Sequence, residues 1–311
     1  MAKLLYDILK TARPRQWVKN VALFAPLIFS GFLFFPGYFT RVFQAFLLFS
    51  TLASALYFFN DISDVRNDRH HPFKKKRPIA AGSLPIHTGA FVGMLLLVLS
   101  LIGSRMLSFF FFLTLLSYAL LQFSYTLLLK KIPIFDVISI AASFVLRVYA
   151  GAFVVNLHMN VWFLLAVLSA SLFLAVGKRQ SERTLLKGVG ISVSKHRVAQ
   201  GHYTQRLLDI YTGMFANTTW LTYALFTFQF QFQKTSGPLP TLFSILPQAL
   251  VAQKWLMITI PIVIYGVMRY LQLVYEQNKG ESPERVLLSD KPILTTAIIW
   301  VLMVIGIIYG V

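Results

Sequence analysis

The chain has no cysteine and few charged residues. Of its 311 residues, only 13% are charged and only 11 are acidic, whereas 57% are hydrophobic. The absence of cysteine excludes disulfides and thiolate metal sites. A soluble domain carries about a quarter charged residues. The mean hydropathy of +0.66 is therefore better explained by membrane-spanning runs than by a buried core.

Long apolar runs recur along the whole chain. A spanning helix needs about 20 mostly apolar residues, and these runs lack the period-2 alternation of a membrane β-barrel. No internal repeat is visible. We predict an all-α polytopic membrane protein that forms a single domain over residues 1–311, with about nine spanning helices. The predicted spans are 18–36, 41–60, 88–104, 107–129, 134–153, 160–177, 208–232, 249–275 and 292–310.

Basic residues are concentrated at one end of these spans. With the N-terminus inside, 23 of the 29 lysines and arginines fall in inner segments, which is the positive-inside pattern. All 11 acidic residues lie in or near the same segments, although that pattern does not require it. We predict a multi-pass protein of the cell inner membrane with its N-terminus and active site cytoplasmic. The net charge of +18 then serves orientation and anionic ligands, and no nucleic-acid partner is expected.

A polar motif, residues 60–68, follows the second span. Asn60, Asp64 and Asp68 are four residues apart, which predicts one shared helical face, with Asp61 one position to the side. Oxygen donors on adjacent turns suit Mg²⁺, which leaves positions for water and phosphate. We predict a Mg²⁺ site at these four residues, with Asp64 and Asp68 catalytic. The alternative is a solvated helix end whose acids balance the basic segment that follows.

The segment after the motif is strongly basic. The lysines at 74–76 and Arg77 supply cations that can bind di- or triphosphate oxygens beside the metal site. A topology signal explains the three lysines equally well. Arg77 is the better ligand candidate because Pro78 stiffens the chain directly after it.

A second polar group surrounds the fourth and fifth spans. Tyr125 and Lys130 end the fourth span, and Asp136 begins the fifth. Arg147 lies nearly on the Asp136 face, about three turns deeper. A charge at that depth indicates a functional site by default, with a structural pair inside the bundle as the alternative.

Two further basic segments have both structural and functional interpretations. Residues 13–20 contain a tryptophan and several cations, which is typical of an interfacial anchor. Lys19 and Asn20 are also able to join a buried polar site. Further along, Lys178 and Glu182 have the spacing of a pair on a helix surface.

The motif at 60–68 resembles the first aspartate-rich motif of the UbiA superfamily of intramembrane prenyltransferases. The resemblance implies nine transmembrane helices around a central cavity, where Mg²⁺ bridges carboxylates to a pyrophosphate and cytoplasmic loops cap the site. The second motif departs from the family pattern. Tyr125 and Lys130 are five residues apart, and Ile140 follows Asp136 where a second aspartate is expected.

Other segments resemble the branch of this superfamily that transfers a phosphoribosyl group to decaprenyl phosphate. They are residues 13–20, Leu146-Arg147 with Ala150-Gly151, Gly177-Lys178-Arg179 with Glu182, residues 194–197 with Tyr203, and Asp290 with Pro292. The branch uses phosphoribosyl pyrophosphate and a polyprenyl phosphate lipid, and implies a role in arabinogalactan precursor supply for the cell wall. It implies a catalytic or ribose-binding role for Asp136. The implied substrate contacts are Lys19, Asn20, Asn60, Arg77, Tyr125, Lys130, Arg147, Lys178 and Arg179.

The sequence therefore predicts a Mg²⁺-dependent phosphoribosyltransferase of the membrane. One alternative is a prenyltransferase that uses a prenyl diphosphate donor and an aromatic or haem-precursor acceptor, which Ile140 disfavours. Another is a transporter, for which repeated halves with broken helices would be expected. The polyprenyl chain length stays open, and a homo-oligomer is compatible with the sequence.

Overall fold

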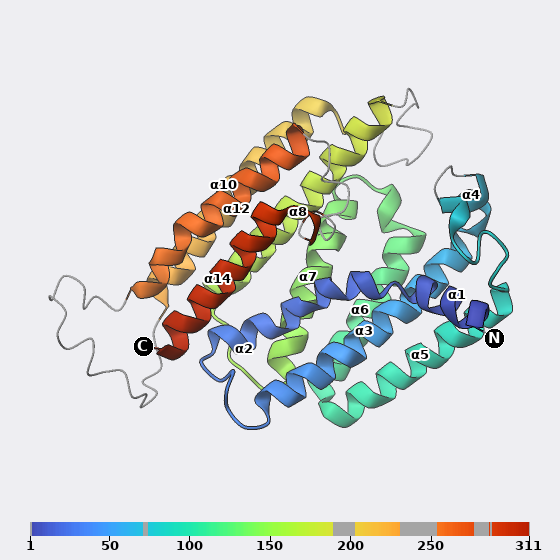
Figure 1. Ribbon diagram of the computed structural model, residues 1–311, viewed down its shortest axis with the longest axis horizontal. Coiled ribbons are helices and arrows are strands. Elements are labelled where there is room, and N and C mark those ends of the chain that lie inside the picture. The colour runs from blue at the N-terminus through green and yellow to red at the C-terminus, as the bar shows by residue number, and fades with distance from the viewer. Residues whose placement is uncertain are drawn as a thin grey trace, which may run out of the picture. The chain divides into compact units, whose positions relative to one another are not determined.

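The computed structural model describes residues 2–70, 74–188, 203–230, 254–276, 286 and 288–310 (Figure 1). Within these residues the secondary structure is helical and contains no strand, as the sequence predicts. Residues 194–197, which contribute to the resemblance, lie outside the described part of the chain.

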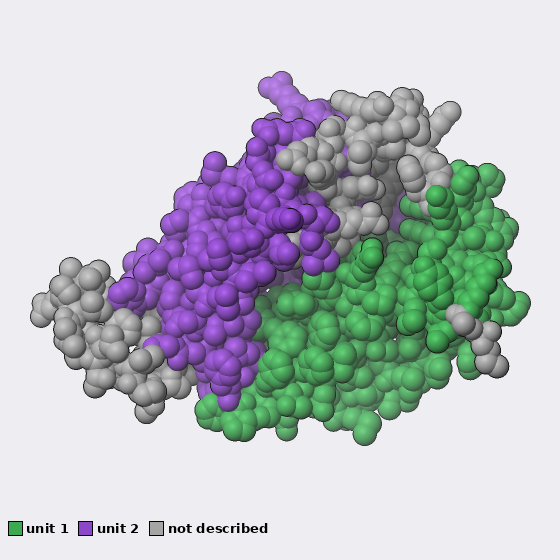
Figure 2. Space-filling view, in the orientation of Figure 1, with its two compact units in different colours: residues 1–25, 35–128, 146–157 green, residues 26–34, 129–145, 158–311 purple. Residues whose placement is uncertain are grey.

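The helices form two compact units, each assembled from several stretches of chain (Figure 2). Unit 1 comprises Met1–Ala25, Phe35–Leu128 and Leu146–Leu157, and unit 2 comprises Pro26–Phe34, Leu129–Val145 and His158–Val311. The helix α7 (Phe135–Val154) contributes its first half to unit 2 and its second half to unit 1. The single-domain organisation stays a prediction.

Unit 1 is built around α3 (Tyr38–Ser63), which packs along α5 (Ile86–Leu107). The elements that also contact α3 are α1 (Ala2–Ala12), η1 (Pro14–Phe24), α4 (Val65–His70) and α6 (Phe109–Leu127). The short η2 (Lys74–Lys76) contacts α4. Close packing of α5 on α3 depends on small residues: a β-carbon at Gly93 would lie 3.0 Å from the Phe58 Cβ. Small residues at the contact are the usual way in which membrane helices approach one another.

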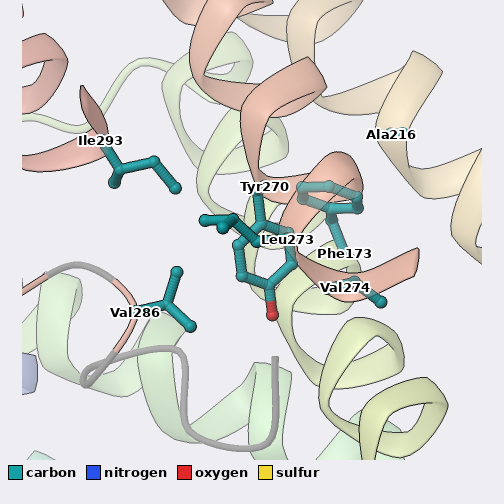
Figure 3. Packing of buried hydrophobic residues seen from close by; sticks show 7 residues of the cluster. All are labelled: Phe173, Ala216, Tyr270, Leu273, Val274, Val286 and Ile293. Atoms are coloured by element: carbon teal, nitrogen blue, oxygen red, sulfur yellow. The ribbon is translucent and has the colours of Figure 1, made fainter. Parts of the chain in front are cut away.

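Unit 2 contains the long pair α8 (Val161–Gly188) and α10 (Gln205–Gln229). Against them lies α12 (Ile260–Tyr275), which also contacts α14 (Lys291–Gly310) and η6 (Trp255–Thr259). The buried hydrophobic cluster of Figure 3 joins α8, α10, α12 and α14, and its members are Phe173, Ala216, Tyr270, Leu273, Val274, Val286 and Ile293.

Seven helical segments of the described residues are long and apolar enough to cross a membrane. The described part of the predicted span 208–232 lies largely on α10, which is 25 residues long but is not among the seven segments. Recurring threonines lower its hydropathy. The predicted span 18–36 is broken into the 3₁₀ helix η1 and the five-residue α2 (Ala25–Phe29). The polytopic all-α class is therefore confirmed, whereas the count of nine spans is not.

Candidate active site

The 60–68 motif lies where α3 ends and α4 begins. α3 ends at Ser63, Asp64 has φ −91° and ψ 1°, and α4 starts at Val65. The motif therefore does not form the uninterrupted helical face that its spacing predicts. Instead, the structure brings together Asp61, which the sequence places to the side, and Asp68.

Asp61 and Asp68 converge on the guanidinium group of Arg77. Its Nη1 lies 3.0 Å from Asp61 Oδ1 and 2.6 Å from Asp68 Oδ2. Arg13 donates a second hydrogen bond to the same Asp61 oxygen. Both aspartates are only 2% exposed. Two buried carboxylates therefore share one cationic nitrogen.

Arg13 is a site residue that motif spacing did not reveal. It adopts φ 54° at the start of η1, directly before Pro14, and its guanidinium group lies 4.8 Å from the centroid of the Tyr57 ring. A positive φ in a non-glycine residue is uncommon and concentrates at functional sites. The one sequence signal was its place at the start of segment 13–20.

Asn60 precedes Asp61 in the chain and contacts the end of α6, within unit 1. The Oδ1 atom of Asn60 accepts a hydrogen bond from Thr126 Oγ1 at 3.3 Å. Tyr125, the neighbour of Thr126, is half-buried, as are Asp64 on the motif and Lys19 on η1. Their predicted contacts with substrate stay predictions.

The oxygen atoms of the 60–68 motif are of the type that Mg²⁺ prefers as ligands. Mg²⁺ is usually held by one or two carboxylates and completes its shell with water and substrate phosphate. Asp61 and Asp68 already converge on one positive charge, with the amide oxygen of Asn60 one residue from Asp61. Among the described residues no group of three Asp, Glu or His side chains is placed to hold a metal. Two carboxylates would leave the remaining coordination positions of such a cation to water and an anionic ligand.

Arg147 belongs to a buried polar network in unit 1. Its Nε donates to Asn20 Oδ1 at 2.9 Å and its Nη2 donates to the Tyr118 hydroxyl at 2.8 Å. Asn20 Nδ2 in turn donates to Ser50 Oγ at 2.9 Å. Arg147 is 3% exposed and Asn20 is 1% exposed. Asn20 therefore lies in a buried polar site, and Arg147 has polar partners inside the bundle, as its structural alternative expects. The substrate contacts predicted for both residues stay predictions. Tyr118 and Ser50 are members of the network that the sequence did not indicate.

Gly151 allows η1 to lie directly against α7. A β-carbon at this position would stand 1.9 Å from the carbonyl oxygen of Leu23. Leu23 lies on η1 close to Asn20, and Gly151 lies one turn after Arg147. The missing side chain therefore permits the approach that the Asn20–Arg147 hydrogen bond needs.

Asp136 and Arg179 form a buried ion pair within unit 2. Both side chains are 0% exposed. Arg179 Nε lies 2.7 Å from Asp136 Oδ2, and the two atoms form an ion pair without hydrogen-bond geometry. Arg179 Nη1 donates to Glu182 Oε2 at 2.6 Å, and the Tyr203 hydroxyl donates to Asp136 Oδ1 at 2.7 Å. Burial and this hydrogen bond raise the pKa of Tyr203 well above its ordinary value, so the hydroxyl stays a donor. Asp136 is thus held by partners of its own unit.

Lys178 and Lys130, the two predicted substrate-binding lysines of unit 2, are more exposed than Arg179. Lys178 Nζ is 3.9 Å from Glu182 Oε1, which is the helix-surface pair that their spacing predicts. Lys130 lies half-buried on the short η3 (Leu129–Lys131). A substrate role for either residue stays a prediction.

Asp136→Ala is expected to lower the free energy of unfolding by about 3 kcal/mol, because it leaves the buried charge of Arg179 without its carboxylate. Thermal unfolding in detergent measures the loss. The double variant Asp136→Ala/Arg179→Met should recover most of it, since neither charge of the pair then remains buried. A native melting temperature combined with a raised KM would instead show that Asp136 meets substrate.

The fold and these clusters define a multi-pass helical membrane protein with a buried aspartate–arginine site at the end of α3. The model of the UbiA prenyltransferase family matches residues 21–290. The chain belongs to this family.

Curated relatives cover nearly the whole chain. A Corynebacterium glutamicum protein named decaprenyl-phosphate phosphoribosyltransferase is 32% identical over 307 residues, which is 97% of this chain and 86% of that protein. A Mycobacterium tuberculosis protein of the same name is 31% identical over 304 residues, 96% of this chain and 93% of that protein. The similarity to these relatives shows that the chain is a transferase enzyme of the UbiA family.

Solved structures share the architecture. A UbiA homolog from Archaeoglobus fulgidus bound to GPP and Mg²⁺ aligns with a TM-score of 0.67 at 16% identity, covering 98% of this chain and 100% of that chain. A structure of digeranylgeranylglyceryl phosphate synthase aligns with a TM-score of 0.62 at 18% identity over 100% of both chains. At these identities the likeness establishes the fold alone.

Proposed function

We propose that this chain transfers a 5-phosphoribosyl group from phosphoribosyl pyrophosphate to a polyprenyl phosphate and releases pyrophosphate, with Mg²⁺ as cofactor. The observation that carries the proposal is 31–32% identity, over nearly the whole chain, to proteins named decaprenyl-phosphate phosphoribosyltransferases. The state of the second motif supports it. Ile140 replaces an aspartate, and Asp136 is neutralised by Arg179.

The residues proposed to hold Mg²⁺ are Asn60, Asp61, Asp64 and Asp68. A metal held there would neutralise the charge that develops on the departing pyrophosphate. Arg77 binds two of these carboxylates in the structure. A guanidinium group binds phosphate oxygens as readily as carboxylates. Arg77 is therefore suited to exchange Asp61 and Asp68 for pyrophosphate oxygens when substrate binds.

The proposed reaction does not depend on proton transfer by a protein side chain. The bond from ribosyl C1 to the pyrophosphate oxygen breaks, and a new bond from C1 to a lipid phosphate oxygen forms. The lipid phosphate is already anionic, so it needs no strong general base. Stabilisation of the leaving pyrophosphate is then the main catalytic contribution, and Lys19, Tyr125 and Lys130 are proposed to help position the two phosphates.

We also propose that the protein lies in the cell inner membrane with its N-terminus and this site cytoplasmic. The positive-inside distribution supports that orientation. A cytoplasmic site gives access to a water-soluble phosphorylated sugar and to the headgroup of a lipid phosphate. The product would supply arabinogalactan synthesis, as the branch resemblance implies.

The test is a reconstituted assay with labelled phosphoribosyl pyrophosphate and decaprenyl phosphate. The expected result is a labelled lipid and one pyrophosphate released per turnover, both lost when EDTA removes the metal. A parallel reaction supplies a prenyl diphosphate and an aromatic acceptor. Prenylation of that acceptor without any phosphoribosylated lipid would overturn the proposal in favour of an aromatic prenyltransferase.

In the absence of substrate, Arg77→Gln is expected to bind Mg²⁺ about tenfold more tightly than the parent protein. The KM of this variant for phosphoribosyl pyrophosphate is expected to rise about tenfold. The substitution removes a cation that competes for Asp61 and Asp68 and also removes a phosphate ligand. Isothermal titration with Mg²⁺ and steady-state kinetics measure the two effects. Lys75→Gln removes the same charge from an exposed position of η2 and serves as the matched control. Weaker Mg²⁺ binding by Arg77→Gln would contradict the exchange.

A further inference from the structure

The N-terminal helix α1 exposes large apolar side chains, while two of its polar side chains are buried. Leu5, Tyr6 and Leu9 are 61%, 64% and 53% exposed, whereas Asp7 and Thr11 are 6% and 1% exposed. A helix on a water-soluble body shows the opposite arrangement, with its apolar stripe toward the core. The outward face of α1 therefore matches a non-aqueous environment.

The contacts of α1 place it beside the C-terminal half of α3, in unit 1 (Figure 1). Ala12 belongs to a buried cluster with Phe58 and Val65, and Ile8 packs against that cluster. The carbonyl oxygen of Ala12 accepts a hydrogen bond from Ser54 Oγ at 2.9 Å. With 11 residues, α1 is about 16 Å long, roughly half of what a membrane crossing needs. It can lie at the membrane surface but cannot span.

Lysines flank the apolar face of α1. Lys3 and Lys10 are exposed along one edge of the helix. Lys10 Nζ lies 3.4 Å from the carbonyl oxygen of Lys76 and donates to it, which brings the exposed lysines of η2 beside α1. An apolar helix face bordered by lysines is the composition that binds the surface of an anionic bilayer.

We propose that α1 lies in the membrane–water interface and that α1 and η2 together form a docking surface for anionic phospholipid headgroups. Leu5, Tyr6 and Leu9 enter the boundary of the acyl region, and Lys3, Lys10 and η2 meet the headgroups. The occupant is the bilayer that holds the protein. This assigns the lysines of η2 to lipid rather than to substrate phosphate.

The docking surface also bears on the site. α1 ends at Ala12, directly before Arg13, whose side chain pairs with Asp61. Attachment of α1 to the bilayer thereby restrains the backbone that presents Arg13. The inference does not depend on which group the enzyme transfers.

The absence of cysteine in the chain makes the test direct. Single variants Leu5→Cys and Leu9→Cys are labelled with bimane and reconstituted in phosphatidylcholine vesicles with or without phosphatidylglycerol. Asn67→Cys, at an exposed position of α4 in the same unit, is the matched control. The labels at positions 5 and 9 should be quenched by doxyl-labelled lipid and should be about fivefold less sensitive to iodide than the label at Asn67.

The headgroup contribution is tested with the triple variant Lys74→Gln/Lys75→Gln/Lys76→Gln. Quenching by doxyl lipid at position 5 should rise with the phosphatidylglycerol fraction and fall with NaCl. Both dependences should be weaker in the triple variant, which keeps Lys3 and Lys10. Iodide sensitivity at position 5 equal to that at Asn67 would overturn the interfacial placement. Protection from both quenchers, together with a disulfide between two Leu5→Cys copies, would show a protein interface instead. Lipid quenching that ignores phosphatidylglycerol would overturn the headgroup assignment.

Discussion

Asp68→Asn is expected to reduce turnover by about 10³-fold while the protein stays folded, the size of loss seen when a main electrostatic contribution to catalysis is removed. The amide keeps the volume of the side chain and an oxygen that can accept a hydrogen bond from Arg77 Nη1. In the parent structure this nitrogen lies 2.6 Å from Asp68 Oδ2. It loses the negative charge that a divalent cation requires. Initial rates of phosphoribosylated lipid formation and the melting temperature in detergent measure the two parts.

Two matched variants sharpen this result. Asn67→Ala changes an exposed neighbour of Asp68 and should alter the rate by less than about twofold. Asp64→Asn should also abolish turnover, whereas a transporter would keep substrate flux in that variant. A near-native rate in Asp68→Asn, with its Mg²⁺ dependence intact, would remove this motif from the catalytic site.

Gly151→Ala is expected to lower the free energy of unfolding by more than about 4 kcal/mol, a size that only severe defects reach. The added β-carbon would stand 1.9 Å from the carbonyl oxygen and 2.7 Å from the carbonyl carbon of Leu23. These are backbone atoms, so no rotamer change relieves the overlap and η1 must move away from α7. The movement would also separate Asn20 from Arg147, leaving a buried guanidinium group short of an acceptor.

Gly306→Ala on α14 is the control for this prediction, because a β-carbon there meets nothing within 4 Å. It should be neutral or stabilise the helix by up to about 1 kcal/mol, since alanine has the higher helix propensity. The yield of folded protein and its melting temperature compare the two variants. If Gly151→Ala melts together with the parent protein, η1 does not press against α7 and the network does not depend on this glycine.

The class of the fold was accessible from local sequence alone. In lipid, a single segment must satisfy its own backbone hydrogen bonds, so each long apolar run dictates a helix without reference to the rest of the chain. The count of nine spans is not confirmed where that local rule is weak. Residues 18–36 combine polar residues, proline and glycine, and form η1 and α2 rather than one spanning helix. In α10, recurring threonines lower the hydropathy of a helix that still forms.

The sequence by itself determined the candidate donors at 60–68, because they lie within nine consecutive residues and their chemistry can be read locally. Only the tertiary structure decided their partners. Arg13 reaches Asp61 across 48 positions of chain, and Arg77 turns back to bind Asp61 and Asp68. Likewise, Asp136 on α7 forms an ion pair with Arg179 on α8. Periodicity describes neighbours along one helix, whereas a buried charge is compensated by whatever packing brings beside it, and that depends on the whole fold.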